Sequence, residues 1–299
     1  MSFEALAREL PGKVLLEEPM SRHTSFKIGG PAEALARPGS VAELRACLDF
    51  AKAQKAPVFF LAGGTNLLVR DGGIRGLTIK LEGEFKEIEI TGSRVKAGAG
   101  ANLALISKKC GLAGLTGLEF AVGIPGSLGG GLVMNAGAHG GELSQVVKKI
   151  CLLEGGGIKE IGGAEAGFEY RNSRFKNSGA LLLWAEMELK AGDAAEIENR
   201  MNEALSRRKA TQPLSLPNAG CVFKNPAGGS AGKMIQDAGL KGLKEGGAQI
   251  SELHANFVVN QGGAKAKDVL ALMQAAREKV KAQFGVALEN EVLIVGEDI

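Results

Sequence analysis

The sequence has few aromatic residues and no long run of charge of one sign. Aromatic residues make up 5% of its 299 residues, with a single Trp and a single Tyr, and the formal net charge is +3. Single-stranded nucleic acid is bound on aromatic side chains in basic grooves. The one dense basic run, Arg207–Lys209, is typical of a solvated helix end. We therefore expect no nucleic-acid partner.

Cysteine motifs and targeting signals are absent as well. The four cysteines lie far apart with no Cys-x-x-Cys, which excludes a local zinc or redox motif, and we expect no metal site. The first ten residues carry acids and lack the basic start and apolar core of a signal peptide. We expect a cytoplasmic monomer with reduced thiols.

One segment is nearly free of charge. Between Gly111 and His139 the only charged residue is Glu119. Pro125, Asn135 and the neighbouring glycines would leave backbone groups without partners in lipid. We therefore predict no membrane insertion, and instead a buried loop and a short helix.

Glycine, in contrast, is abundant. The chain has 44 glycines, and eight of them fall within Gly123–Gly141. Each glycine loses much backbone freedom on folding, so this density indicates a backbone that approaches something closely. A phosphate-bearing cofactor held by N–H groups fits, and close packing of a helix on a sheet without ligand is the alternative.

A second glycine-rich loop follows a predicted strand at Val58–Leu61. Gly63 and Gly64 precede Thr65 and Asn66, and such a turn can wrap a pyrophosphate or be an ordinary tight loop. Neither loop has the Gly-x-Gly-x-x-Gly pattern of a Rossmann unit. A dinucleotide would therefore be held on another scaffold.

The remaining patterns indicate mixed helix and strand. Ser40-Val-Ala-Glu43 is a capping box, which predicts a helix to about Gln54. Further predicted elements are strands at 77–81, 88–90, 95–97, 180–189 and 291–295, and helices at 102–110, 195–210 and 264–284. This order predicts a strand-rich α+β region to about residue 200, and then a smaller α/β unit.

Further motifs narrow the choice of protein family. They are His23–Gly30, Tyr170–Lys176, Asn218–Pro226, Ala238–Gly242, His254–Asn260 and Leu288–Val292. With the two glycine loops, they resemble in order and spacing the UDP-N-acetylenolpyruvoylglucosamine reductase (MurB) family, in its shorter second type. The loops themselves resemble the FAD-binding region of the vanillyl-alcohol-oxidase and p-cresol-methylhydroxylase type.

The resemblance implies an α+β fold with a two-part FAD-binding region and a smaller C-terminal α/β substrate-binding domain. We place the first FAD-binding subdomain at 1–56, completed by a C-terminal strand in 288–299. The second subdomain is placed at 57–200 and the substrate-binding domain at 201–287.

It also implies a reaction. Family members reduce FAD with NADPH and then reduce UDP-N-acetylglucosamine enolpyruvate to UDP-N-acetylmuramate, a step of peptidoglycan synthesis. The residues that the resemblance assigns to FAD are Gly63, Gly64, Thr65, Asn66, Leu67, Gly123, Ile124, Pro125, Gly126, Ser127, Gly129, Gly130, Asn135, Ala136 and Gly137.

Three residues match the catalytic positions of the family. Arg171 and Glu291 match the pair that stabilises the enolate, and Glu291 requires a raised pKa if it acts as a neutral acid. Cys221 stands where the family usually has the serine that donates a proton. Each residue has an alternative role without catalysis. Arg171 would be an exposed, salt-bridging arginine, Glu291 a polar residue before an edge strand, and Cys221 an inert buried thiol. An exposed Cys221 thiol would be sensitive to alkylation.

The substrate side departs from the family pattern. Leu293 stands where members often have an arginine, and the substrate-side tyrosine loop of the longer type is missing, because the sole tyrosine belongs to the Arg171 motif. The resemblance assigns substrate binding to Tyr170, Lys224, Asn225, Lys233 and His254, and Arg207 is a further candidate for the diphosphate.

Two other functions remain open at this level. One is a flavin oxidase of a small alcohol or sugar, which would be reoxidised by air and would not need NADPH. The other is a flavin- or nucleotide-sugar-binding protein without turnover, which would have no need of a proton donor at Cys221.

Overall fold

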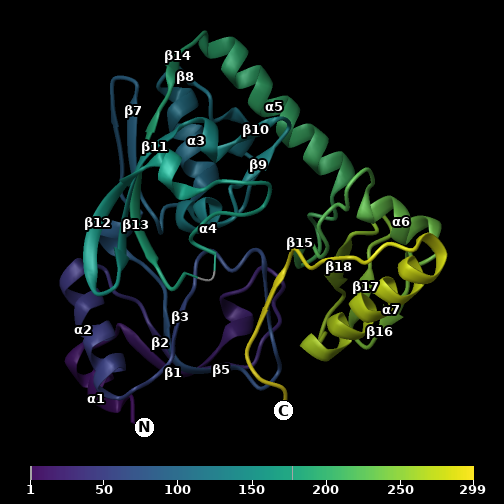
Figure 1. Ribbon diagram of the computed structural model, residues 1–299, viewed down its shortest axis with the longest axis horizontal. Helices are drawn as coiled ribbons and strands as arrows, with labels where there is room; N and C mark the ends of the chain where they lie inside the picture. Colours follow the sequence, from purple (N-terminus) through teal and green to yellow (C-terminus); the bar gives the residue numbers. More distant parts are fainter. Residues whose placement is uncertain (1, 177) are drawn as a thin grey trace.

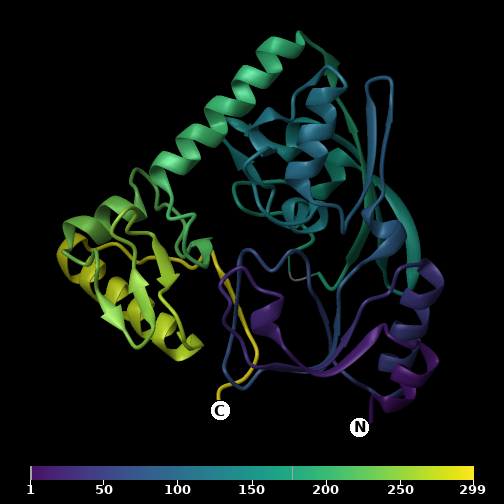
Figure 2. The ribbon, with the colours of Figure 1, turned by 180° about the vertical axis from the view of Figure 1, so that it is seen from behind.

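The computed structural model describes residues 2–176 and 178–299. An N-terminal region with two large sheets is joined to a C-terminal lobe by the long helix α5 (Ala194–Thr211) (Figure 1). The view from behind shows the end of the chain returning from this lobe toward the N-terminal region (Figure 2).

The first sheet has four strands in the order β1-β2-β5-β3. β1 (Val14–Pro19) is antiparallel to β2 (Pro31–Ala36), whereas β5 (Ile74–Ile79) is parallel to both β2 and β3 (Val58–Phe60). Helices α1 (Glu4–Glu9) and α2 (Val41–Ala53) pack against this sheet. The predicted boundary at residue 56 thus falls inside the sheet, because β3 and β5 follow it in the chain.

The second sheet is antiparallel, in the order β12-β11-β13-β7-β6. Its strands are β6 (Ile88–Thr91), β7 (Arg94–Gly98), β11 (Val147–Glu154), β12 (Gly157–Gly162) and β13 (Leu181–Glu188). Helix α4 (Leu128–Val133) contacts β7 and β13, and α3 (Leu103–Leu112) contacts the base of α5. Two short pairs complete the region, β8 (Leu115–Thr116) with β14 (Lys190–Ala191) and β9 (Gly137–Ala138) with β10 (Gly141–Glu142).

The C-terminal lobe is a third sheet, antiparallel throughout, with two helices. Its strand order is β15-β18-β17-β16, from β15 (Asn218–Cys221), β16 (Lys244–Glu245), β17 (Ala248–Ile250) and β18 (Phe257–Asn260). Helix α7 (Ala266–Phe284) packs on the sheet and on α6 (Ala231–Asp237). The last strand, β19 (Leu293–Val295), leaves the lobe and pairs in parallel with β4 (Leu67–Val69).

Local sequence explains where the helices begin. The Ser40 hydroxyl accepts the N–H of Glu43 at 3.3 Å, which confirms the predicted start of α2. Asn102 caps α3 in the same way at 2.9 Å, and Ser127 is the N-cap of α4. The charge-poor segment is therefore loop and short helix. Among the described residues, no helix is both long and apolar enough to cross a membrane.

The buried side chains form separate cores. One lies between the two N-terminal sheets, and another fills the C-terminal lobe. Phe26 and Ile28, from the His23–Gly30 motif, are fully buried in the core of the lobe. That motif therefore fastens the first sheet to the lobe, and the cleft between them receives residues from both.

Candidate active site

A cleft of about 800 Å³ lies where the two glycine loops face the C-terminal lobe. It is lined by the Gly63–Leu67 loop, the Gly123–Ser127 loop, part of the 136–139 segment and the 214–221 segment, with Arg171 and Glu291. A second cavity of about 520 Å³ shares the glycine loops and extends toward Lys80 and Asn102. Together the two cavities offer more space than either alone along the same glycine loops, which suits a large dinucleotide.

The two loops touch through glycine. A methyl group added at Gly63 would lie 2.5 Å from the Cα of Gly126, and one added at Gly126 would lie 2.7 Å from the hydroxyl of Thr65. The Thr65 hydroxyl in turn donates to the carbonyl of Pro125 at 3.2 Å. Only glycine permits this approach, which brings two backbone segments to the same ligand.

The first loop presents N–H groups to the site. Within the described residues, no hydrogen bond uses the backbone N–H of Gly63, Gly64, Thr65 or Asn66. Adjacent N–H groups of this kind bind phosphate oxygens. In the second cavity, Lys80 adds a half-buried ammonium group whose pKa is lowered by burial. These residues fit the pyrophosphate and the elongated shape of FAD.

Most of the residues assigned to FAD line these cavities. The exception is Asn135, which is 1% exposed and bonds within the protein. Its amide donates to the carbonyl of Glu169 at 3.2 Å and accepts the N–H of Ser144 at 3.1 Å. Lining residues are Gly63, Gly64, Thr65, Asn66, Leu67, Gly123, Ile124, Pro125, Gly126, Ser127, Gly129, Gly130, Ala136 and Gly137.

Arg171 and Glu291 meet in the cleft although they lie 120 residues apart in the chain. The Nε of Arg171 lies 3.1 Å from a carboxylate oxygen of Glu291. That N–H is not aligned for a hydrogen bond and has no other acceptor in the described residues. Arg171 also has a φ of 53°, a left-handed conformation that is uncommon for a long side chain.

Burial dominates the titration of Glu291. It raises the pKa of the carboxyl above its ordinary value, although Arg171, Lys176 and Lys224 act to lower it. The neutral acid therefore persists to a higher pH than in an exposed glutamate. This direction agrees with the hypothesis of a raised pKa.

Cys221 lies on the same wall of the cleft, at the end of β15. Burial and the nearby Glu291 raise the pKa of its thiol to about 12, against the opposing effects of Arg171 and the Asn256 side chain. The thiol is half-buried and stays protonated at neutral pH. The raised pKa lowers the thiolate fraction on which the expected sensitivity of an exposed thiol to alkylation depends.

The residues assigned to substrate binding are spread more widely. Tyr170 is 58% exposed beside the guanidinium of Arg171, and Lys224 pairs with Glu289 at 3.1 Å. Asn225 accepts the N–H of Ala231. None of these three lines the large cleft.

The other two lie deeper in the lobe or on its surface. Lys233 pairs with Asp237 one helical turn away, at 2.9 Å, and is well exposed. His254 stacks edge-on against Phe257, and its Nδ1 accepts the N–H of Asn256. Burial lowers the pKa of this imidazole. Neither residue lines the cleft.

Sequence reasoning missed a cation of the cleft, Arg208. Its neighbour Arg207 is exposed, whereas Arg208 is half-buried in the cleft wall near Gly123. Its Nε donates to Gln212 at 3.0 Å, no acidic partner is assigned to it within residues 2–176 and 178–299, and burial lowers its pKa. The helical period would have separated the two arginines only if the cleft-facing side of α5 had been known.

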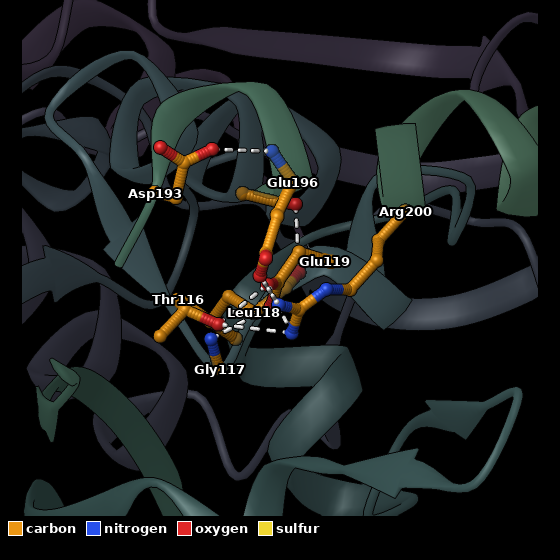
Figure 3. Close-up of polar contacts among 8 residues, drawn as sticks. Thr116, Gly117, Leu118, Glu119, Asp193, Glu196 and Arg200 are labelled. Atoms are coloured by element: carbon orange, nitrogen blue, oxygen red, sulfur yellow. Dashed lines mark hydrogen bonds and ion pairs between the residues drawn. The ribbon is translucent and has the colours of Figure 1, made fainter. Parts of the chain in front are cut away.

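A polar cluster anchors the other end of α5 next to the Gly123 loop (Figure 3). Glu119, in the short 3₁₀ turn Glu119–Ala121, accepts from the Thr116 hydroxyl and the Gly117 N–H, both at 2.6 Å. Arg200 of α5 reaches this carboxylate at 3.5 Å. The same helix therefore spans from this anchor to Arg208 in the cleft.

Leu293 brings no charged group to the cleft. The side chain is 46% exposed on β19 and lines the cleft without any polar group. Arg171 and Arg208 are the arginines of that cleft lining. Within the described ranges, no group of three or more His, Cys, Asp or Glu side chains is placed to hold a metal ion.

Comparison with known proteins decides the family. Residues 212–295 match the family described as "UDP-N-acetylenolpyruvoylglucosamine reductase, C-terminal domain", and residues 32–158 match that of an FAD binding domain. The chain is 47% identical to UDP-N-acetylenolpyruvoylglucosamine reductase 2 of Symbiobacterium thermophilum, over 96% of this chain and 94% of the relative. The chain belongs to the UDP-N-acetylenolpyruvoylglucosamine reductase family.

Further matches cover the whole MurB fold. The reductase of Alkaliphilus oremlandii is 46% identical over 99% of this chain and 98% of its own length. The crystal structure of MurB from Thermus caldophilus superposes with a TM-score of 0.82 at 37% identity, over 94% of this chain and 98% of that chain. The predictions of an FAD-dependent oxidoreductase, and of an FAD-binding region followed by a smaller C-terminal domain, are confirmed.

Proposed function

We propose that this MurB family member reduces UDP-N-acetylglucosamine enolpyruvate to UDP-N-acetylmuramate with NADPH as hydride donor. The observation that carries the proposal is that one cleft combines the two glycine loops with Arg171, Cys221 and Glu291. The relatives that match nearly the full chain bear the name of this reductase.

FAD would be held by the N–H groups of Gly63–Asn66 and by the Gly123–Ser127 loop, with Lys80 near its far end. Bound FAD would supply the hydride chemistry that links NADPH to the enolpyruvyl double bond. The protein must then stabilise the charge that develops beside the substrate carboxylate.

Arg171 can stabilise this negative charge because its guanidinium stays positive and presents several N–H donors. Among the described residues its Nε–H has no aligned acceptor, and we propose that it is available to a ligand oxygen. Glu291 lies 3.1 Å away and, as a neutral acid, would donate a hydrogen bond to the same oxygen.

Cys221 would complete the reaction. Its S–H bond breaks, a C–H bond forms at the substrate carbon that did not receive the hydride, and the electron pair stays on sulfur. Arg171, which lowers the thiol pKa, stabilises the resulting thiolate until water returns a proton.

For the diphosphate of the substrate we propose Arg208, which takes over the cationic contact that Leu293 cannot make. A guanidinium without an acidic partner is suited to phosphate oxygens. Tyr170 and Lys224, near Arg171 and Glu289, are proposed for the rim. Three of the assigned residues have partners within the lobe: Asn225, Lys233 and His254. We propose that they support substrate binding by holding the structure of the lobe, without contacting the substrate. Cytoplasmic location and a monomeric state stay predictions.

An anaerobic flavin titration tests the function. NADPH should bleach the flavin absorbance, and the enolpyruvyl sugar nucleotide should restore it with formation of a product that has gained two hydrogen atoms. Reoxidation by air alone with no effect of the sugar nucleotide would instead support an oxidase. Flavin that NADPH does not reduce would support a binding protein without turnover.

A further inference from the structure

The backbone that directly follows Cys221 is held by a buried residue, Asn256. This side chain is 2% exposed. Its Oδ1 accepts the N–H of Phe223 at 3.0 Å, and its Nδ2 donates to the carbonyl of the same residue at 2.8 Å. Its own backbone carbonyl accepts the N–H of Val222 at 2.9 Å. One residue thus makes three hydrogen bonds to the two residues after Cys221.

These bonds extend the β15–β18 ladder, whose last paired residue on β15 is Cys221. β15 and β18 pair at Asn218 with Val259 and at Cys221 with Phe257, with a register shift between them. Gly220, next to Cys221, has a φ of +78°. Beyond Phe257, the Asn256 amide continues the pairing that backbone groups would otherwise make.

The other side of the Cys221 segment is bonded to the segment of Glu291. The Val222 carbonyl accepts the N–H of Glu291 at 3.0 Å, and Lys224 donates its N–H to the Glu289 carbonyl at 2.9 Å. The positions of Cys221 and Glu291 are therefore coupled through Val222. Asn256 closes this arrangement from the side opposite to Glu291.

Asn256 is itself fixed by its loop. Its N–H donates to Nδ1 of His254 at 3.2 Å, and the Ser251 hydroxyl accepts the N–H of His254 at 3.4 Å. The amide therefore has little freedom to leave Phe223. Such a fixed side chain can hold a reacting group to a fraction of an ångström.

We propose that Asn256 is a positioning residue for the protonation step, which holds the Cys221–Phe223 backbone so that the thiol faces the cleft beside Arg171 and Glu291. The inference rests on the proposed role of Cys221 as proton donor. Asn256 does not touch the substrate and supplies no proton. It acts by keeping the S–H within reach of the substrate carbon, and its side chain also acts to lower the pKa of the Cys221 thiol.

A purely structural role would make a different prediction, and Asn260 provides the matched control. Asn260 lies in the same strand region and is 7% exposed. Its side chain makes three hydrogen bonds, to Phe26, Gly262 and Ala264, and the Asn256 side chain makes two, both to Phe223. It has no bond to the Cys221 segment. Asn260→Ala therefore reports the cost of losing a buried amide in this lobe without moving the thiol.

The experiment compares the two half-reactions of the FAD-loaded enzyme by stopped flow. In Asn256→Ala, flavin reduction by NADPH should stay within about twofold of wild type. Reoxidation by the enolpyruvyl sugar nucleotide should slow by about 10- to 100-fold, with a larger solvent deuterium isotope effect. If the alanine variant does not fold, Asn256→Ser is measured in its place. Its side chain is neutral and too short to bond both the N–H and the carbonyl of Phe223.

The outcomes separate the possibilities. Reoxidation of the Asn256 variants no slower than that of Asn260→Ala, with an unchanged isotope effect, would overturn the positioning role. If Cys221→Ala itself reoxidises normally, the donor role fails and the inference with it. Slow reoxidation of Cys221→Ala together with normal reoxidation of Asn256→Ala would overturn the role of Asn256 and leave the donor role of Cys221 intact.

Discussion

The carboxyl group of Glu291 is buried beside a guanidinium, and these two influences on its pKa oppose each other. Burial prevails and raises the pKa, so the neutral acid is present below the raised pKa and is lost as the pH rises through it. The rate of flavin reoxidation by the substrate should fall over that pH range. Glu291→Gln, which keeps a neutral hydrogen-bond donor, should lose this dependence.

The control for that profile is Glu289→Gln. Glu289 is a neighbouring acid that pairs with Lys224 and has a 75% exposed side chain. Its removal should leave the pH profile unchanged. A wild-type rate that does not change with pH, or a falling limb that persists in Glu291→Gln, would contradict a neutral Glu291.

The motifs of the sequence pointed to candidate catalytic residues, but not to how those residues are held. Arg171, Cys221 and Glu291 could be assigned by resemblance, and the structure brings all three to one cleft. The internal partner of Asn135 could not be predicted, because its contacts depend on segments that are distant in sequence. The pairing of Lys233 with Asp237, four residues on in the same helix, was not among the predictions, which assigned Lys233 to the substrate.

At the scale of elements, the contact between the glycine loops makes a sharp prediction. Gly126→Val would place a side chain at a φ of +110° and against the Thr65 hydroxyl. The loops must then separate, and the protein should be purified without FAD and without yellow colour. Absorbance at the flavin bands and the FAD content after denaturation measure this effect.

Gly156→Val controls for backbone strain alone. Gly156 also has a positive φ, of +83°, but an added Cβ meets nothing within 4 Å at this hairpin. This variant should keep its FAD. Equal loss of FAD in both variants would mean that strain, and not the meeting of the loops, is responsible.

The anchor of α5 predicts unequal effects of its two charged partners. Glu119→Ala leaves the half-buried Gly117 N–H without its acceptor, which costs about 1–3 kcal/mol. Arg200→Ala removes a half-exposed ion pair worth about 0–1 kcal/mol. Urea unfolding measures both, and a larger loss in Arg200→Ala would contradict this account.

The pH dependence of that anchor has a fixed sign. Burial alone would raise the pKa of Glu119, but hydrogen bonds from Thr116 and Gly117 and the charge of Arg200 outweigh it and lower the pKa. Its contribution to stability is therefore present above its unfolded pKa and is lost as the pH falls through the folded pKa.

Elements with a clear local signal could be predicted from the sequence, and the others could not. The caps at Ser40 and Asn102 and the apolar stripe of α7 located their helices. The strands of the C-terminal sheet have two to four residues each, too few to show a period. Their pairing depends on tertiary contacts such as those of Asn256.

For the whole molecule, the lobe is tied to the first sheet by Asp71. Its two carboxylate oxygens accept the N–H groups of Ala266 and Lys267, at 2.8 and 3.1 Å, at the start of α7. Asp71→Ala should cost about 0.5–2 kcal/mol in unfolding free energy, as the loss of a helix cap does.

Asp237→Ala is the matched control, because Asp237 makes only a surface pair with Lys233 through its side chain. Its effect should stay within about 0.5 kcal/mol. Equal effects of the two substitutions would mean that Asp71 does not brace the lobe.

The boundaries between the subdomains are harder to predict from the sequence than the residues of the site. The first sheet extends past residue 56 because β3 and β5 pair with β2, and the C-terminal strand pairs with β4. Such pairings join segments far apart in sequence, and no local signal records them.

The central claim is that Cys221 gives the proton that completes substrate reduction. The most direct measurement is the rate at which the sugar nucleotide reoxidises NADPH-reduced enzyme in wild type, Cys221→Ser and Cys221→Ala. We expect substantial reoxidation in the serine variant and a stall in the alanine variant, with flavin reduction unchanged in both. Full reoxidation by Cys221→Ala at the wild-type rate would contradict the claim.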